Sequence, residues 1–218
     1  MQKIILTLAV FFLLSPSLPA WGASEEQNLL DAIQKQYESV TTFTAKFVQK
    51  SHVKTMNQTV EARGDVQIKK PGKMKWVYNA PDPQILISNQ KTLWLYVPDE
   101  KQVTKVPVES IYSSNTPALF LAGKGKLTDS FNVVQVLKEK DGITVVLVPK
   151  QEDNSLERLV LFADNKNYQI TGSSVYDKLG NKTDIHFSDI EVNRPVADST
   201  FVFQVPEGVE LLDYSTNK

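Results

Sequence analysis

The sequence contains no cysteine, and this absence excludes several kinds of chemistry. Without a thiol the chain forms no disulfide, no thiolate zinc site and no cysteine nucleophile. The lipid modification of secreted bacterial proteins is excluded as well, because the acyl chains are attached to an N-terminal cysteine. The protein is therefore predicted not to be acylated itself.

Histidine is scarce, and the common catalytic motifs are missing. The two histidines, His52 and His186, are too few for a zinc cluster, and His186 alternates with apolar neighbours, which predicts an exposed strand position. The sequence has no Gly-x-Ser-x-Gly elbow, and residues 123–126 lack the spacing of a phosphate loop. A triad assembled from distant residues is left open by spacing. We nevertheless expect no enzyme activity, no cofactor and no metal.

A strong charge of one sign and a second long apolar run are also absent. The 24 basic and 25 acidic residues give a net charge of −1, which predicts no affinity for nucleic acid. One apolar run, residues 4–14, follows Lys3 and precedes Ser15-Pro16, as in a signal peptide too short to span a bilayer. We predict cleavage of residues 1–22, before Ala23 or alternatively before Ser24. A single exported domain over residues 23–218 would remain.

The first predicted element is an amphipathic helix from Ser24 to Val40. Its apolar residues, among them Leu30 and Ile33, recur at spacings of three and four, and Ser24 with Gln27 forms a capping box. Two roles are left open for this helix. It either packs on the protein core or covers a ligand.

Beyond residue 42 the apolar period changes to two, which predicts strands. Eleven short runs separated by turn residues are expected, over residues 43–54, 60–69, 73–78, 84–88, 93–97, 103–106, 132–137, 143–148, 156–162, 169–176 and 183–190. Runs of this length with tight turns predict a twisted antiparallel sheet that curls into a barrel. The fold class is mainly β with α.

Several of these strands are apolar on both faces. Leu93 and Leu95 lie on one side of a strand, and Trp94 and Tyr96 lie on the other. Such strands need a second apolar surface or an apolar guest. The pattern alone is compatible with both a two-layer core and a ligand cavity.

A short apolar helix interrupts the strands after Asn115. Thr116 is the expected cap and Pro117 the first helical residue, and glycines 123 and 125 end the helix. Leu119, Phe120 and Leu121 make it apolar on nearly every side, so it is expected to pack against an apolar surface. A buried connector and a hinged lid are both consistent with this composition.

The motifs together resemble the periplasmic outer-membrane lipoprotein carrier (LolA) family. The segment Gly64-x₆-Pro71-Gly72-x₃-Trp76-x-Tyr78-x₂-Pro81 carries the resemblance, together with Ile87-Ser88-Asn89-x-Lys91-Thr92-Leu93-Trp94-x-Tyr96-x-Pro98. The resemblance implies an open antiparallel β-barrel of about eleven strands with a helical lid over its concave face. It further implies a monomeric periplasmic chaperone without a cofactor. Such a carrier receives lipoproteins from an inner-membrane ABC-type releasing complex and passes them to an outer-membrane receptor.

The same resemblance suggests residues for the site. The cavity that receives the acyl chains is expected to be lined by Leu30, Ile33, Phe43, Phe47, Met74, Trp76, Trp94 and Leu121. Lys70 stands where the family commonly has the arginine that fastens the lid, and Lys70 is the predicted latch. Pro117, Leu119, Phe120 and Leu121 would form a lid helix. A shift of one residue in a strand would reverse the face of every cavity assignment on it.

Two other functions compete with the carrier. A periplasmic regulatory module that senses lipids would use the same apolar cavity, but it usually carries a second domain. A secreted lipid hydrolase would need His52 or His186 in its active site.

Overall fold

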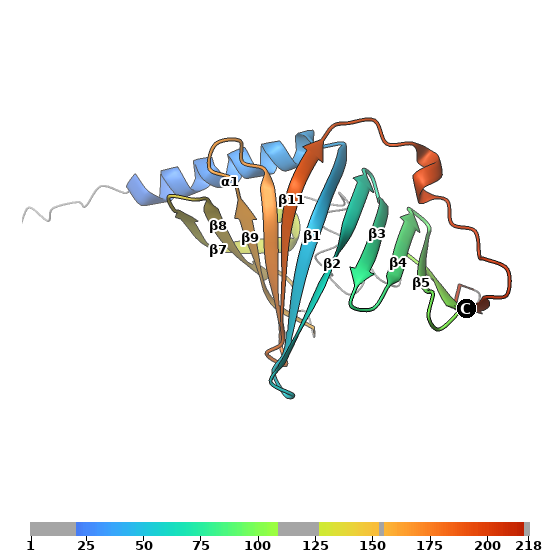
Figure 1. Cartoon of the computed structure of the whole chain (residues 1–218). Coiled ribbons are helices and arrows are strands. Elements are labelled where there is room, and N and C mark those ends of the chain that lie inside the picture. The colour runs from blue at the N-terminus through green and yellow to red at the C-terminus, as the bar shows by residue number, and fades with distance from the viewer. Residues whose placement is uncertain (1–20, 109–126, 153–154, 216–218) are drawn as a thin grey trace, which may run out of the picture.

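One curved sheet of twelve strands, with a long helix lying over one face, dominates the computed structural model (Figure 1). The structure describes residues 21–108, 127–152 and 155–215. The elements are α1 (Trp21–Ser39), β1 (Thr42–Val53), β2 (Gln58–Lys69), β3 (Lys73–Ala80), β4 (Gln84–Asn89), β5 (Thr92–Val97), β6 (Gln102–Pro107), α4 (Leu127–Ser130), β7 (Phe131–Lys138), β8 (Ile143–Pro149), β9 (Leu156–Ala163), β10 (Ile170–Asp177), β11 (Lys182–Val192), the 3₁₀ turn η1 (Asp198–Phe201) and β12 (Glu210–Asp213).

Most strands pair antiparallel with the next strand along the chain, and β1 and β11 join the two series of hairpins. The strand order is β12-β6-β5-β4-β3-β2-β1-β11-β10-β9-β8-β7, so the sheet has two separate edges and does not close into a full barrel. This confirms the predicted open antiparallel fold and all eleven predicted strands. The twelfth strand, β12, was missed because it has four residues and pairs with β6 in the parallel direction, without a hairpin turn to mark it.

Helix α1 buries its apolar stripe against one half of the sheet. Leu29, Leu30, Ile33 and Tyr37 are buried, as the spacing of three and four requires. They form a first apolar cluster with β7 to β10, and the face of the sheet that they cover is called the inner face below. The predicted helix is thus confirmed, with an observed start at Trp21 and an end at Ser39.

A second apolar cluster lies on the inner face of the other half of the sheet. Phe47 and Trp76 meet edge to face there, with ring centroids 5.0 Å apart. Strand pairing makes the inner face continuous between the two halves. Phe47 on β1 pairs with Phe187 on β11. Ile185, on the same face of β11, pairs with Ser173 on β10, which in turn pairs with Leu161 of the first cluster. The buried members are Val40, Phe43, Ala45, Phe47, Val66, Ile68, Met74, Trp76, Leu93, Val108 and Phe187.

The outer face of the apolar strands is covered by the chain's own C-terminal segment. Phe203 packs on Trp94 and Tyr96, with ring centroids 6.2 Å and 6.0 Å apart, and Phe201 is buried. Residues 193–215 run across this face to β12, which pairs with β6. The second apolar surface that the strands require is therefore supplied internally on the outer side.

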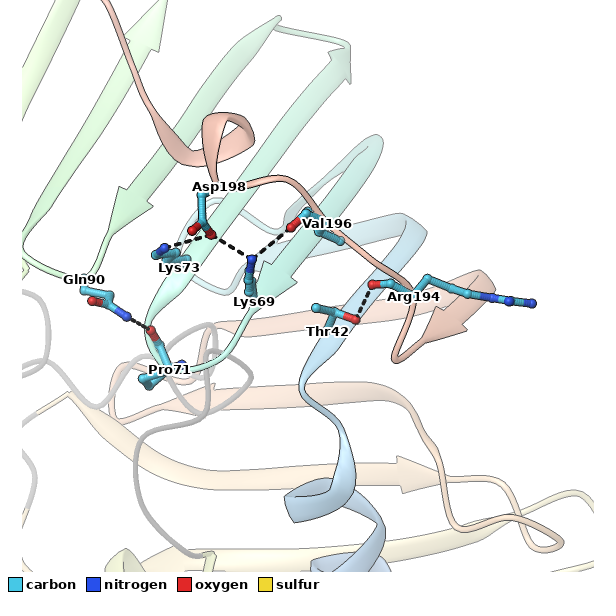
Figure 2. A network of polar contacts seen from close by, with 8 residues as sticks. All are labelled: Thr42, Lys69, Pro71, Lys73, Gln90, Arg194, Val196 and Asp198. Atoms are coloured by element: carbon cyan, nitrogen blue, oxygen red, sulfur yellow. Dashed lines mark hydrogen bonds and ion pairs between the residues drawn. The ribbon is translucent and has the colours of Figure 1, made fainter.

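Polar contacts hold this C-terminal segment on the sheet (Figure 2). The carboxylate of Asp198 binds the ammonium groups of Lys69 at 2.7 Å and Lys73 at 2.9 Å. Lys69 also donates a hydrogen bond to the carbonyl oxygen of Val196 at 3.0 Å. These contacts join the segment to β2 and β3, close to the turn that connects the two strands.

Two sequence predictions fall on residues that the structure does not describe. The predicted signal peptide lies almost entirely within residues 1–20. The predicted lid helix, with Pro117, Leu119, Phe120 and Leu121, lies within residues 109–126. In the described ranges, no helix is long and apolar enough to cross a membrane.

Candidate binding site on the inner face

A cavity lies where the two apolar clusters meet, between the C-terminal end of α1 and strands β1, β2 and β10. Its free volume is about 20 Å³, which is room for about one water molecule, so the cavity is nearly closed in this structure. Its lining combines Tyr37 and Ile170 of the first cluster with Val40, Phe43 and Ile68 of the second. Gln36, Lys70 and Gln169 complete the wall.

Six of the predicted cavity residues lie on the inner face and are buried. Leu30 and Ile33 come from α1 and belong to the first cluster. Phe43, Phe47, Met74 and Trp76 come from β1 and β3 and belong to the second cluster. Their placement agrees with an apolar lining, and their role in binding stays a prediction. Leu121 lies outside the described residues.

The prediction for Trp94 was wrong. Trp76 pairs with Leu86 and Leu86 with Leu95, so these three side chains share the inner face. Trp94 is adjacent to Leu95 in the strand and therefore points to the outer face, where it packs on Phe203. Alternation along the strand separates the two faces correctly, but it does not say which of them is inner.

Lys70 fastens the C-terminal end of α1 to the sheet. Its ammonium group donates a short hydrogen bond to the carbonyl oxygen of Tyr37 and lies 3.5 Å from the centroid of the Tyr37 ring. The last carbonyl groups of a helix lack partners within the helix and carry partial negative charge, which favours a cation there. The turn that presents Lys70 is held by Gln90, whose side-chain amide donates to the carbonyl oxygen of Pro71 at 2.7 Å (Figure 2).

The burial of Lys70 changes its acidity. Partial removal of the ammonium group from water lowers its pKa from the usual 10.5 to about 8, and the nearby carboxylate of Glu38 opposes this change. The group is therefore charged at neutral pH, although its environment disfavours the charge.

Sequence reasoning missed a row of polar side chains on the inner face. The Tyr78 hydroxyl donates to Gln49 at 3.1 Å, and the Gln49 amide donates to Ser51 at 3.1 Å. Ser173, two strands away from Gln49 in the sheet, is buried on the same face. The sequence contained a sign of this row, because these polar residues stand at positions that alternate with outward-facing residues along their strands.

The histidines lie away from this site. Both His52 and His186 occupy outer-face positions, since they alternate with Ser51 and Phe187 of the inner face. The His186 ring stacks on Phe162, with centroids 5.7 Å apart, and is exposed as predicted. In the part of the chain that the structure describes, no group of three or more potential metal ligands comes together.

Comparison with known proteins gives a consistent result. Residues 38–204 match the family model described as outer membrane lipoprotein carrier protein LolA. The chain is 32% identical over 213 residues to an outer-membrane lipoprotein carrier protein of Azotobacter vinelandii, and this match covers 96% of the chain and 97% of the relative. A carrier protein of Hahella chejuensis is 31% identical, with 97% and 98% covered.

The solved structures agree on the fold. A conserved protein of Thermus thermophilus aligns with a TM-score of 0.54 over 87% of this chain and 99% of its own, at 11% identity.

Proposed function

The chain belongs to the LolA family of outer-membrane lipoprotein carrier proteins, and we propose that it shields the acyl chains of lipoproteins on its inner face during transport through the periplasm. The observation that carries this proposal is the placement of both apolar clusters on one face of an open sheet. A cargo of acyl chains needs a continuous apolar surface of this kind.

The energetics fit such a carrier. Each methylene group removed from water contributes about 0.8 kcal/mol, so acyl chains require cover in an aqueous compartment. Contacts with an apolar lining are not directional, and Met74 in particular has a flexible side chain that adapts to different shapes. A lining of this type binds many lipoproteins and also lets them go.

The helix α1 is the cover that we propose to move. It closes the first cluster, and Lys70 holds its end beside the cavity at the junction. Release of the Lys70 contact would let α1 turn away while the sheet keeps its hydrogen bonds. Lysine offers a single charged point rather than the planar fork of an arginine, so the contact is made to one carbonyl oxygen.

The partners follow from the proposed route. An inner-membrane ABC-type complex would load the carrier, and an outer-membrane receptor would accept the lipoprotein. The chain has no cysteine to acylate, which favours a diffusing carrier over a membrane-anchored receptor. The outer-face positions of both histidines argue against a lipid hydrolase that acts on a guest at the inner face.

A release assay tests the proposal. Purified protein is added to spheroplasts, and lipoproteins in the supernatant are measured in complex with it. The half-buried neighbours Leu86 and Ile85 provide a matched pair, because Leu86 faces inward and Ile85 faces outward. Leu86→Asp is expected to reduce release strongly, and Ile85→Asp to retain it. Absence of release by the folded wild type, beside an active carrier as positive control, would refute the proposal.

A further inference from the structure

Two buried hydrogen-bond donors on the inner face have no acceptor within the described part of the chain. Among the described residues, the indole nitrogen Nε1 of Trp76 and the hydroxyl oxygen Oγ of Ser173 are the buried side-chain atoms without a hydrogen-bond partner. Both residues are 2% exposed. A buried donor left without an acceptor costs about 1–3 kcal/mol, so two of them on one face call for an explanation.

Trp76 lies within the second cluster. Its ring contacts Phe47 edge to face, and its strand neighbours on either side are Val66 and Leu86. These three neighbours offer no side-chain acceptor. The indole N–H can only donate, so a partner must bring a lone pair into an apolar environment.

Ser173 lies at the border between the two clusters. It pairs with Leu161 on β9 and with Ile185 on β11, and both of these side chains are apolar. The position contrasts with that of Ser88, which is equally buried on the inner face but donates to the carbonyl oxygen of Gly72 at 3.2 Å. Of these two buried inner-face serines, Ser88 therefore has a partner, and Ser173 has none among the described residues.

An acylated ligand carries hydrogen-bond acceptors that these two donors lack among the described residues. The hydrocarbon part of an acyl chain carries no lone pair, but the linkage that attaches it to glycerol or to an amine carries a carbonyl oxygen. An ester carbonyl only accepts hydrogen bonds, which matches two groups that are available as donors. The sheet is curved (Figure 1), and Trp76 on β3 and Ser173 on β10 both lie on its inner face.

We propose that Trp76 and Ser173 donate hydrogen bonds to carbonyl oxygens of the acyl linkages of the bound lipid, and thereby distinguish acyl esters from plain hydrocarbon chains. This inference rests on the proposed function. It adds to it a defined ligand chemistry and two residues that recognise it. In a lining that is otherwise non-directional, these donors set how deep the linkage enters.

A comparison of two lipopeptides tests the proposal. One carries a diacylglyceryl group on its N-terminal cysteine, and the other is the dialkyl ether analogue, in which a methylene replaces each ester carbonyl. Binding of each to the purified full-length mature protein is measured by displacement of a fluorescent fatty acid analogue. The ratio of the two Kd values isolates the contribution of the carbonyl groups. Wild type is expected to prefer the ester by about tenfold.

Matched variants locate the effect. Ser173→Ala is expected to lower the ester preference about three- to tenfold, while Ser88→Ala leaves it unchanged. At position 76, 3-benzothienylalanine keeps the shape of tryptophan and replaces the N–H by sulfur, and it too is expected to lower the preference. Folding gives a second readout. Ser173→Ala removes an unsatisfied group and should leave the denaturation midpoint unchanged or raised, whereas Ser88→Ala should lower it.

The outcomes separate the two proposals. If wild type binds the ester and the ether equally well, or if Ser173→Ala and the Trp76 replacement both keep the full preference, the donors do not recognise carbonyls and this inference is overturned while the carrier function stands. If folded wild type binds neither lipopeptide, the proposed function fails and the inference falls with it.

Discussion

The ammonium group of Lys70 contacts both the backbone carbonyl oxygen and the aromatic ring of Tyr37, in the last turns of α1. The two residues are 33 positions apart in the chain. This contact links the turn between β2 and β3 to the helix that covers the other half of the sheet. Lys70 thus contacts both the helix end and the edge of the cavity, and Asn193 adds a hydrogen bond from its side-chain amide to the carbonyl oxygen of Ser39 at 3.2 Å.

Replacement of Lys70 by methionine is expected to loosen α1. Methionine keeps the apolar stem but loses the hydrogen bond and the cation–π contact, together worth about 1–2 kcal/mol at a partly exposed site. Amides in the last turns of α1 should exchange with deuterium about fivefold to thirtyfold faster. The matched control is Lys140→Met, at an exposed position in the turn between β7 and β8. Equal exchange in both variants would show that Lys70 does not hold the helix.

The folded protein is expected to become more stable against unfolding as the pH rises above 8. The pKa of Lys70 is about 8 in the folded protein and 10.5 when the group is solvated. Between these values the unfolded chain binds more protons than the folded one, so the free energy of unfolding increases with pH in this window. Urea unfolding at pH 7.5 and 9.5 measures the change.

The comparison variant for this experiment is Lys70→Arg, because arginine stays charged throughout the window. The rise in stability should be larger in wild type than in the arginine variant. A rise of the same size in both proteins would assign the pH dependence to other groups.

Trp94→Ala is expected to weaken the cover of the outer face and to leave cargo binding intact. The substitution removes the contact with Phe203, and loss of a partly buried aromatic ring should cost about 2–3 kcal/mol. Limited proteolysis should then cut within residues 193–215 sooner than in wild type. If lipoprotein release in the spheroplast assay falls as far as it does with Leu86→Asp, the assignment of Trp94 to the outer face is wrong.

The hold of the C-terminal segment is expected to weaken in acid. Lys69 and Lys73 lower the pKa of the Asp198 carboxyl from 3.8 to about 2. A carboxyl pKa that is lower in the folded than in the unfolded protein stabilises the fold at pH values above the unfolded pKa. This contribution is lost as the pH falls from about 4 to about 2. The protection factors of the β12 amides, which correct for the slower intrinsic exchange in acid, should therefore fall over this range in wild type.

Asp198→Asn should show low protection factors in β12 already at pH 6 and a smaller change of these factors on acidification. Asp189→Asn is a suitable control, because Asp189 pairs with Lys46 elsewhere on the outer face. An unchanged acid response in Asp198→Asn would mean that the ion pairs with Lys69 and Lys73 do not hold the segment.

Local patterns predicted most of the elements, and pairing over long distances explains what they missed. The stripe of Leu30 and Ile33 and the alternation around Trp94 each depend on a few neighbouring residues. The position of β12 depends on β6, about a hundred residues earlier in the chain, and four residues alone carry too weak a signal. Alternation likewise placed Trp94 and Leu95 on different faces of the strand. Which of the two faces is the inner one became clear only from the positions of α1 and Phe203 in the structure.

By itself, the sequence determined that the protein forms no disulfide, that a helix with one apolar stripe precedes a series of antiparallel hairpins, and that several strands are apolar on both sides. These properties follow from composition and from the periods of helix and strand. Only the tertiary structure decided which face α1 covers, that Lys70 contacts Tyr37, and that the donors of Trp76 and Ser173 have no acceptor among the described residues. Such relationships depend on register and packing between distant segments, which local patterns do not encode.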